Sequence, residues 1–215
     1  MQKKKKNIII RICRRLWHIV CPPPTPEQLA ERKKKADYEF LISHGVETEY
    51  GYVTLLGEPI IYKASNSRIV IGKGVTLVSN THYNYAGINH PVILATQRPG
   101  AEIHIGDGSG FSGTTVVAFE KVEIGKNFGG GANTCIYDGD FHGIKASERV
   151  KDECVKFSPV KIGDDVWMAA GSMVLKGVII GDRAVVGAMS LVNKNVEADS
   201  IYAGNPAKFV RKIEQ

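Results

Sequence analysis

The sequence predicts an all-β fold, a parallel β-helix of short strands preceded by a short α-helical extension. The first observation is a period of six that runs without a slip through Ile162, Met168, Val174, Ile180, Val186 and Val192. The second is a small residue after many of these positions, at Gly163, Ala169, Gly181 and Gly187. Helices repeat their buried face every three or four residues and plain strands every two. A period of six therefore indicates triangular coils, each built from three short strands joined by tight corners.

Length and composition fit one soluble domain with an appendage. The 215 residues are 43% hydrophobic and 23% charged, which is ordinary for a globular protein. The net charge is +6, and much of the excess lies at residues 3–6 and 32–35. Because aromatic residues are not interleaved with these basic residues, a groove for nucleic acid is not expected. We expect a basic helical extension (1–47), a β-helix (48–200) with loops at 80–100 and 138–159, and a tail (201–215).

Cysteine spacing and hydropathy favour a cytoplasmic protein. Cys13, Cys21, Cys135 and Cys154 show no CxxC spacing, so free thiols in a reducing compartment explain them. No apolar run reaches the length of a transmembrane helix. Residues 7–20 follow four lysines and resemble a signal peptide, but three arginines interrupt the apolar stretch, which argues against secretion.

The N-terminal region predicts two helices. In residues 1–21, Ile9, Ile12, Leu16 and Ile19 form a helical stripe opposed by Arg11, Arg14 and Arg15. Such a helix suits either the inner surface of the membrane, through residues 1–20, or docking onto the coil or a neighbouring subunit. Prolines at 22–24 end it. Thr25, with Pro26 and Gln28 behind it, predicts the capping box of a second helix that ends near Gly45.

The repeats begin before the regular region and are interrupted twice. A first hexad pattern surrounds Ile69 and Ile71, and a polar, proline-bounded insertion is expected at 80–100. The pattern resumes at Ile103 and Val122, and a second insertion at 138–159 precedes the regular coils. Loops that leave a rigid scaffold are where binding and catalytic residues gather.

Together these features resemble the hexapeptide-repeat acyltransferases, including galactoside, xenobiotic and polysaccharide-biosynthesis O-acetyltransferases. The resemblance covers residues 69–213, and its most specific parts are the hexads, the segment 165–168 (Asp-Val-Trp-Met) and the ending 203–208 (Ala-Gly-Asn-Pro-Ala-Lys). It implies a left-handed parallel β-helix, where β-crossovers are otherwise right-handed. It also implies acetyl-CoA as the donor of an acetyl group, with no metal.

The resemblance points to His142 as the catalytic residue. It ends the segment 137–142 (Tyr-Asp-Gly-Asp-Phe-His), and a histidine at this place in the family takes a proton from the acceptor. Imidazole suits the task because it is largely unprotonated near neutral pH and can still hold a proton. We expect Asp140 or Asp138 to orient the ring. A main-chain N–H of the adjoining coil is the expected oxyanion donor.

The resemblance also implies a binding surface for coenzyme A along the outside of the coils. Trp167 would flank the pantetheine arm, and Ala170 and Ala188 would leave room for it. The nucleotide end and its phosphates would meet polar and basic residues, namely Asn193, Lys194, Lys208 and Arg211.

The family's assembly, a homotrimer with active sites between neighbouring coils, is expected here too. A sugar hydroxyl or amino group of a surface-polysaccharide precursor is the expected acceptor, with the aromatic residues of loop 80–100 shaping its pocket. Antibiotic, xenobiotic or serine O-acetyltransfer are alternatives of the same class. A carbonic anhydrase-like zinc enzyme, with three histidines on one ion, or a β-helix scaffold without chemistry are alternatives of other classes.

Overall fold

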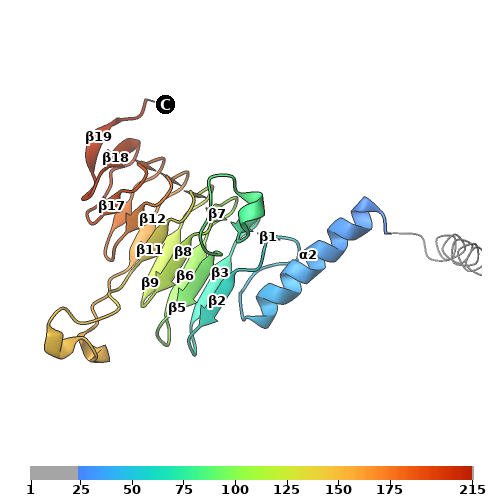
Figure 1. The fold of residues 1–215 in the computed structure, drawn as a ribbon, viewed down its shortest axis with the longest axis horizontal. Coiled ribbons are helices and arrows are strands. Elements are labelled where there is room, and N and C mark those ends of the chain that lie inside the picture. Colours follow the sequence, from blue (N-terminus) through green and yellow to red (C-terminus); the bar gives the residue numbers. More distant parts are fainter. Residues whose placement is uncertain (1–23, 215) are drawn as a thin grey trace, which may run out of the picture.

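The computed structural model describes residues 24–214, which form a triangular coil with one helix at its N-terminal end (Figure 1). Successive strands from β1 to β17 belong in turn to three sheets, which we name A, B and C, and the last two strands both belong to sheet B. Sheet A contains β3 (Arg68–Ile71), β6 (Glu102–Ile105), β9 (Lys121–Ile124), β12 (Val160–Ile162) and β15 (Ile179–Ile180). Sheet B contains β1 (Val53–Leu56), β4 (Val75–Val78), β7 (Gly110–Ser112), β10 (Gly129–Gly130), β13 (Trp167–Met168), β16 (Val185–Val186), β18 (Ser200–Ala203) and β19 (Lys208–Lys212). Sheet C contains β2 (Ile60–Lys63), β5 (Ile93–Thr96), β8 (Thr115–Ala118), β11 (Cys135–Tyr137), β14 (Met173–Val174) and β17 (Leu191–Val192).

The predicted period of six is confirmed, because successive hexad residues fall on the three sheets in turn, like the three faces of a prism. Ile162 lies in sheet A, Met168 in sheet B and Val174 in sheet C, and each is at most 1% exposed. The next coil repeats the pattern in parallel register, pairing Ile162 with Ile180 and Met168 with Val186. The hexad residues therefore stack into one continuous aliphatic core.

The corners between sheets A and B explain the glycine that follows many hexad residues. Asp107 accepts a hydrogen bond from the main chain of Lys73 in the coil before it, at 2.8 Å. Asp164 accepts one from Lys126 in the same way, at 2.7 Å. A Cβ on Gly125 would overlap the Asp164 carboxylate oxygen, so a side chain there would break the contact between coils.

The predicted second helix is α2 (Pro26–Ser43), and its capping box is present. The Thr25 hydroxyl accepts from the Gln28 main-chain N–H at 3.2 Å, and the side-chain Oε1 of Gln28 accepts from the Thr25 N–H at 2.9 Å. The predicted first helix, with Cys13 and Cys21, lies outside the described residues. Within residues 24–214, no helix has both the length and the apolar character required to span a bilayer.

The coil differs from the sequence prediction at the first insertion. Its strands begin with β1 and β2, inside the predicted range 48–200 and ahead of the first hexad pattern at Ile69. The predicted insertion at 80–100 is too long. β5 lies inside it, and its Leu94 is completely buried. The prolines that bound this stretch stand outside β5, which contains the apolar residues, so only residues 79–92, including η1 (Thr81–Tyr83), leave the coil.

Candidate active site

The insertion at 138–159, which we call the histidine loop, lies between β11 and β12 as predicted and includes η2 (Ala146–Glu148) and η3 (Asp152–Cys154). It projects from the corner between sheets C and A, on the opposite side of the coil from η1 in this view (Figure 1). The His142 side chain is exposed, and its Nδ1 lies 3.1 Å from the carbonyl oxygen of Arg149. Since a carbonyl only accepts, the proton of the neutral ring must be on Nδ1, which leaves the Nε2 lone pair available.

Asp138 is completely buried and binds the main chain of the preceding coil. Its carboxylate accepts N–H bonds from Phe119 at 2.6 Å, Glu120 at 2.8 Å and Lys121 at 2.7 Å. Burial raises the pKa of the Asp138 carboxyl, and the three N–H donors, which favour the ionised form, offset part of that rise. Asp138 thus fixes the start of the histidine loop to the corner between β8 and β9.

Asp140 pairs with a lysine of the next coil. Lys176 Nζ donates to Asp140 Oδ1 at 2.6 Å, and the Asp140 N–H donates to the Lys156 carbonyl at 2.8 Å. Sequence reasoning left open whether Asp138 or Asp140 orients His142. In the described structure both carboxylates have other partners, and the atom that selects the tautomer is a main-chain carbonyl, which no side-chain pattern reveals.

Aromatic packing seats the loop on sheet C. The ring of Phe141 lies 5.5 Å from Phe119 and 5.6 Å from Tyr137, centroid to centroid, with edge-on geometry in both pairs. Phe157, from the other end of the loop, stacks at 6.5 Å on Phe119. The residue next to His142 is therefore held by rings from two coils.

The residues predicted to bind coenzyme A fall into three groups on the coil. Trp167 is on the outer face of sheet B, 56% exposed, with its ring over Gly129. Ala170 and Ala188 are exposed at the corner between sheets B and C, in successive coils. The remaining four are exposed at the C-terminal end of the coil: Asn193 and Lys194 follow β17, and Lys208 and Arg211 lie on β19.

The first insertion emerges from the same corner as the two alanines. Asn133 ties it to the coil, accepting from the Asn89 N–H at 2.9 Å and donating to the Gly87 carbonyl at 3.0 Å. Tyr83 and Tyr85 remain exposed, and the base of the loop has a shallow pocket lined in part by Asn80 and His90.

Sheet C separates this corner from His142. The strand order places Trp167, Ala170 and Ala188 on one side of sheet C and the histidine loop on the other. Sheets A and C also differ in the chemistry of their outer faces. One outward row of sheet C reads Ile60, Ile93, Thr115, Cys135, Met173, Leu191, and the other reads Tyr62, Ala95, Val117, Tyr137.

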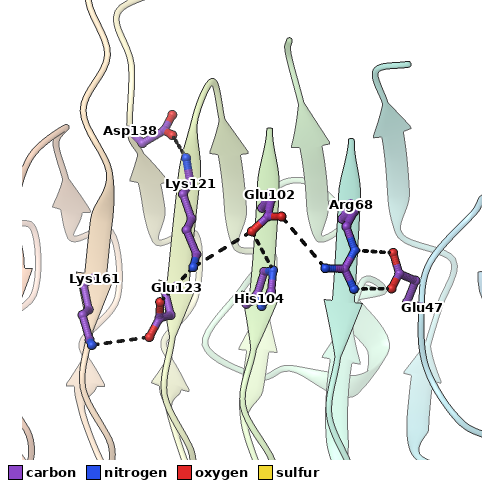
Figure 2. Close-up of polar contacts among 8 residues, drawn as sticks. All are labelled: Glu47, Arg68, Glu102, His104, Lys121, Glu123, Asp138 and Lys161. Carbon is purple, nitrogen blue, oxygen red and sulfur yellow. Dashed lines mark hydrogen bonds and ion pairs between the residues drawn. The ribbon is translucent and has the colours of Figure 1, made fainter. Parts of the chain in front are cut away.

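Sheet A instead presents a ladder of charges (Figure 2). Arg68 binds Glu47 through two hydrogen bonds, at 2.9 and 2.6 Å, and holds the pKa of that carboxyl below its ordinary value. Across the next strands Lys121 lies 3.3 Å from Glu123, which lies 3.5 Å from Lys161. The charges of sheet A thus neutralise one another in the monomer, whereas the two outward rows of sheet C contain no charged side chain.

Comparison with known proteins agrees with this architecture. Residues 159–194 match the family model described as bacterial transferase hexapeptide (six repeats). A Saccharomyces cerevisiae protein whose name assigns it to the acetyltransferases is 34% identical over 119 residues, 54% of this chain and 59% of that protein. A chloramphenicol acetyltransferase of Agrobacterium fabrum is 47% identical over 51 residues, 24% of each chain. The chain thus spans between about a quarter and three fifths of these relatives.

Solved structures share the fold at lower identity. AntD, an N-acyltransferase from Bacillus cereus, superposes with a TM-score of 0.62 at 22% identity, covering 82% of this chain and 88% of that one. The polySia-specific acetyltransferase NeuO gives a TM-score of 0.55 at 21% identity, covering 75% and 66%. The fold is the left-handed parallel β-helix that the resemblance implied.

Within residues 24–214 no three His, Cys, Asp or Glu side chains are grouped as ligands for one metal ion. The repeat match and the coil itself agree. Residues 159–194 carry hexapeptide repeats of the kind described for bacterial transferases, and the relatives reported above are named as acetyltransferases.

Proposed function

We propose that this protein is an acetyltransferase that moves an acetyl group from acetyl-CoA to a hydroxyl or amino group of a sugar. The observation that carries the proposal is the state of His142, an exposed imidazole whose Nδ1 is held by the Arg149 carbonyl. Its Nε2 makes no hydrogen bond to another described residue. A base that faces outward from a rigid scaffold is what proton abstraction from a bound acceptor requires.

The chemistry needs only one such base, because the thioester is already activated. Nε2 of His142 takes the proton of the acceptor as its oxygen or nitrogen forms a bond to the acetyl carbonyl carbon. The tetrahedral intermediate then expels the thiolate of coenzyme A, which recovers the proton from the imidazolium. Main-chain N–H groups near the acyl carbon would stabilise the oxyanion.

In this proposal the donor binds along the edge that carries Trp167, Ala170 and Ala188. The two alanines leave main-chain groups accessible in successive coils, and the exposed indole offers an apolar wall to the pantetheine arm. Asn193, Lys194, Lys208 and Arg211, all exposed, would meet the nucleotide and its phosphates.

The proposed site is complete only between two copies of the chain. Sheet C separates His142 from the Trp167 edge within one chain. A neighbouring copy that covers sheet C could bring its own Trp167 edge to this His142, and three copies would close the ring. We therefore propose a homotrimer, held through the uncharged outer face of sheet C.

A sugar acceptor is supported by the exposed rings of Tyr83 and Tyr85, which can stack on the apolar face of a pyranose. Antibiotic acetylation is the second candidate. It is favoured by the 47% identity to a chloramphenicol acetyltransferase over 51 residues, a match that covers 24% of the relative.

The test is a measurement of acetyl-CoA-dependent thiol release with panels of nucleotide sugars, lipid-linked sugars, chloramphenicol and macrolides. Release with a sugar alone supports the first candidate, and release with an antibiotic alone supports the second. His142→Ala should lower kcat by roughly 100- to 10,000-fold, the usual contribution of a general base. An equal rate in parent and variant would remove His142 from the mechanism.

A further inference from the structure

Two ion pairs clip the histidine loop to the coil at separate points along one edge of the prism. Lys176 belongs to the corner between β14 and β15, one coil after the loop. Arg98 belongs to the corner between β5 and β6, two coils before it. Neither residue has a place in the proposed chemistry, and each contacts a residue of the loop.

The Lys176 clip acts next to His142. Lys176 Nζ donates to Asp140 Oδ1 at 2.6 Å, and the two side chains are 33% and 31% exposed. Asp140 also fixes its own main chain, donating its N–H to Lys156 in the returning limb of the loop. His142 is two residues further along the chain, so the contact between Lys176 and Asp140 restricts where the imidazole can lie.

The Arg98 clip acts at the far end of the loop. Its guanidinium donates to the Asp152 carboxylate at 2.8 Å and to the Asp152 carbonyl at 2.9 Å. It also lies 5.1 Å above the centre of the Phe157 ring. A guanidinium is suited to both contacts at once, because its plane stacks on a ring while its edge donates hydrogen bonds.

We propose that Lys176 and Arg98 are positioning residues, which hold His142 at a fixed height along the coil for the proposed acetyl transfer. This inference rests on the proposed function. The loop has little regular structure of its own, so its placement depends on these clips and on the aromatic packing. A displacement of the base by about 1 Å can lower a rate by up to roughly 100-fold, so clips of modest stability can have large effects on kcat.

The test compares Lys176→Met, Asp140→Asn, their double variant and Arg98→Met with Lys161→Met as a matched control. Lys161 also forms an ion pair, with Glu123 at 3.5 Å, but on the outer face of sheet A. Each clip variant should lose about 10- to 100-fold in kcat with an unchanged KM for acetyl-CoA. The double variant should be no worse than Asp140→Asn, and Lys176→Arg should restore most of the rate. The control should match the parent.

A second readout does not depend on activity. Trypsin can cleave the exposed loop at Lys145, Arg149 and Lys151, and no clip variant removes these sites. Release of the loop in Lys176→Met or Arg98→Met should speed this cleavage, with melting temperature as the check on overall folding. Lys161→Met should be cleaved at the parental rate.

The possible results distinguish a failure of this inference from a failure of the proposed function. The inference would be overturned if Lys176→Met and Arg98→Met both kept the parental rate of loop cleavage, or both kept the parental kcat. The proposed function would still stand in that case if His142→Ala were inactive. A far greater loss in Asp140→Asn than in Lys176→Met would show that Asp140 acts on His142 itself. If the parent transfers no acetyl group, the proposed function fails, and the cleavage rates alone decide whether the clips hold the loop.

Discussion

At the scale of the residue, Asp138 and Asp140 show how two similar side chains in one short motif acquire different tasks. Asp138 is buried and serves three successive N–H groups, whereas Asp140 meets a lysine at the surface. Asp138 directly follows β11 and continues the strand's inward alternation after Ile136, whereas Asp140 lies two residues further into the loop, where the strand has ended. A buried carboxylate with three main-chain donors is a structural anchor of the loop.

Asp138→Asn tests that anchor. The amide keeps one acceptor oxygen but turns an NH₂ group toward an N–H, so at least one buried donor loses its partner. We expect the free energy of unfolding to fall by about 1–3 kcal/mol, measured by urea denaturation. Glu153→Gln, at an exposed position of the same loop, is the control and should leave stability unchanged. Equal stability of the two variants would contradict the role.

At the scale of the element, α2 closes the open edge of the coil. β1 pairs only with β4 within sheet B, so the N–H and carbonyl of Leu55 point away from that sheet. Lys33 Nζ donates to the Leu55 carbonyl at 2.6 Å, and Asp37 accepts from the Leu55 N–H at 3.1 Å. Lys33 and Asp37 are also paired at 2.8 Å. Side chains of a helix thus replace the missing next strand.

Asp37→Ala should expose this dependence. The substitution leaves the Leu55 N–H and the Lys33 ammonium without their partner, and we expect a loss of about 1–3 kcal/mol in urea unfolding. Glu39→Ala is the matched control, because Glu39 pairs with Lys35 at 3.7 Å while 64% exposed. Surface pairs of that kind contribute at most about 1 kcal/mol. Indistinguishable losses in the two variants would show that α2 is not needed at the edge.

An element could be predicted from the sequence wherever neighbouring residues alone determine it. The hexads follow from one inward residue per strand, and the Thr25–Gln28 box follows from the four free N–H groups at a helix start. The rung formed by β5 was missed because the prolines at 91 and 99 suggested a loop. The partner of Asp140 could not be predicted, since Lys176 is brought beside it only by the pitch of the coil after a long insertion.

At the scale of the whole molecule, the faces of the prism are chemically distinct. Sheet A balances its charges strand by strand, so it loses little by remaining in water (Figure 2). On sheet C the middle strands are covered by the aromatic residues around the histidine loop. The β2 end of the face is open, with Ile60 52% and Tyr62 56% exposed, and Met173 and Leu191 at the other end are partly exposed. Sheet C lies between His142 on one side and the Trp167 edge on the other, and its open outer residues are the surface that a second copy would cover.

Met173→Glu tests this assembly at the end of sheet C that lies beyond the histidine loop. Met173 is outward-facing and neighbours Cys135 and Leu191, so a carboxylate there would be buried without a partner if a second copy covers the face. We expect light scattering to give three times the chain mass for the parent and one chain mass for the variant, with loss of transferase activity. Ile179→Glu places the same charge on sheet A, where Ile179 is 51% exposed, and should stay trimeric and active. A monomeric parent would contradict the proposed trimer, and an unchanged mass for Met173→Glu would place the subunit contact away from this face. In either case no neighbouring copy would bring its Trp167 edge to His142 across sheet C.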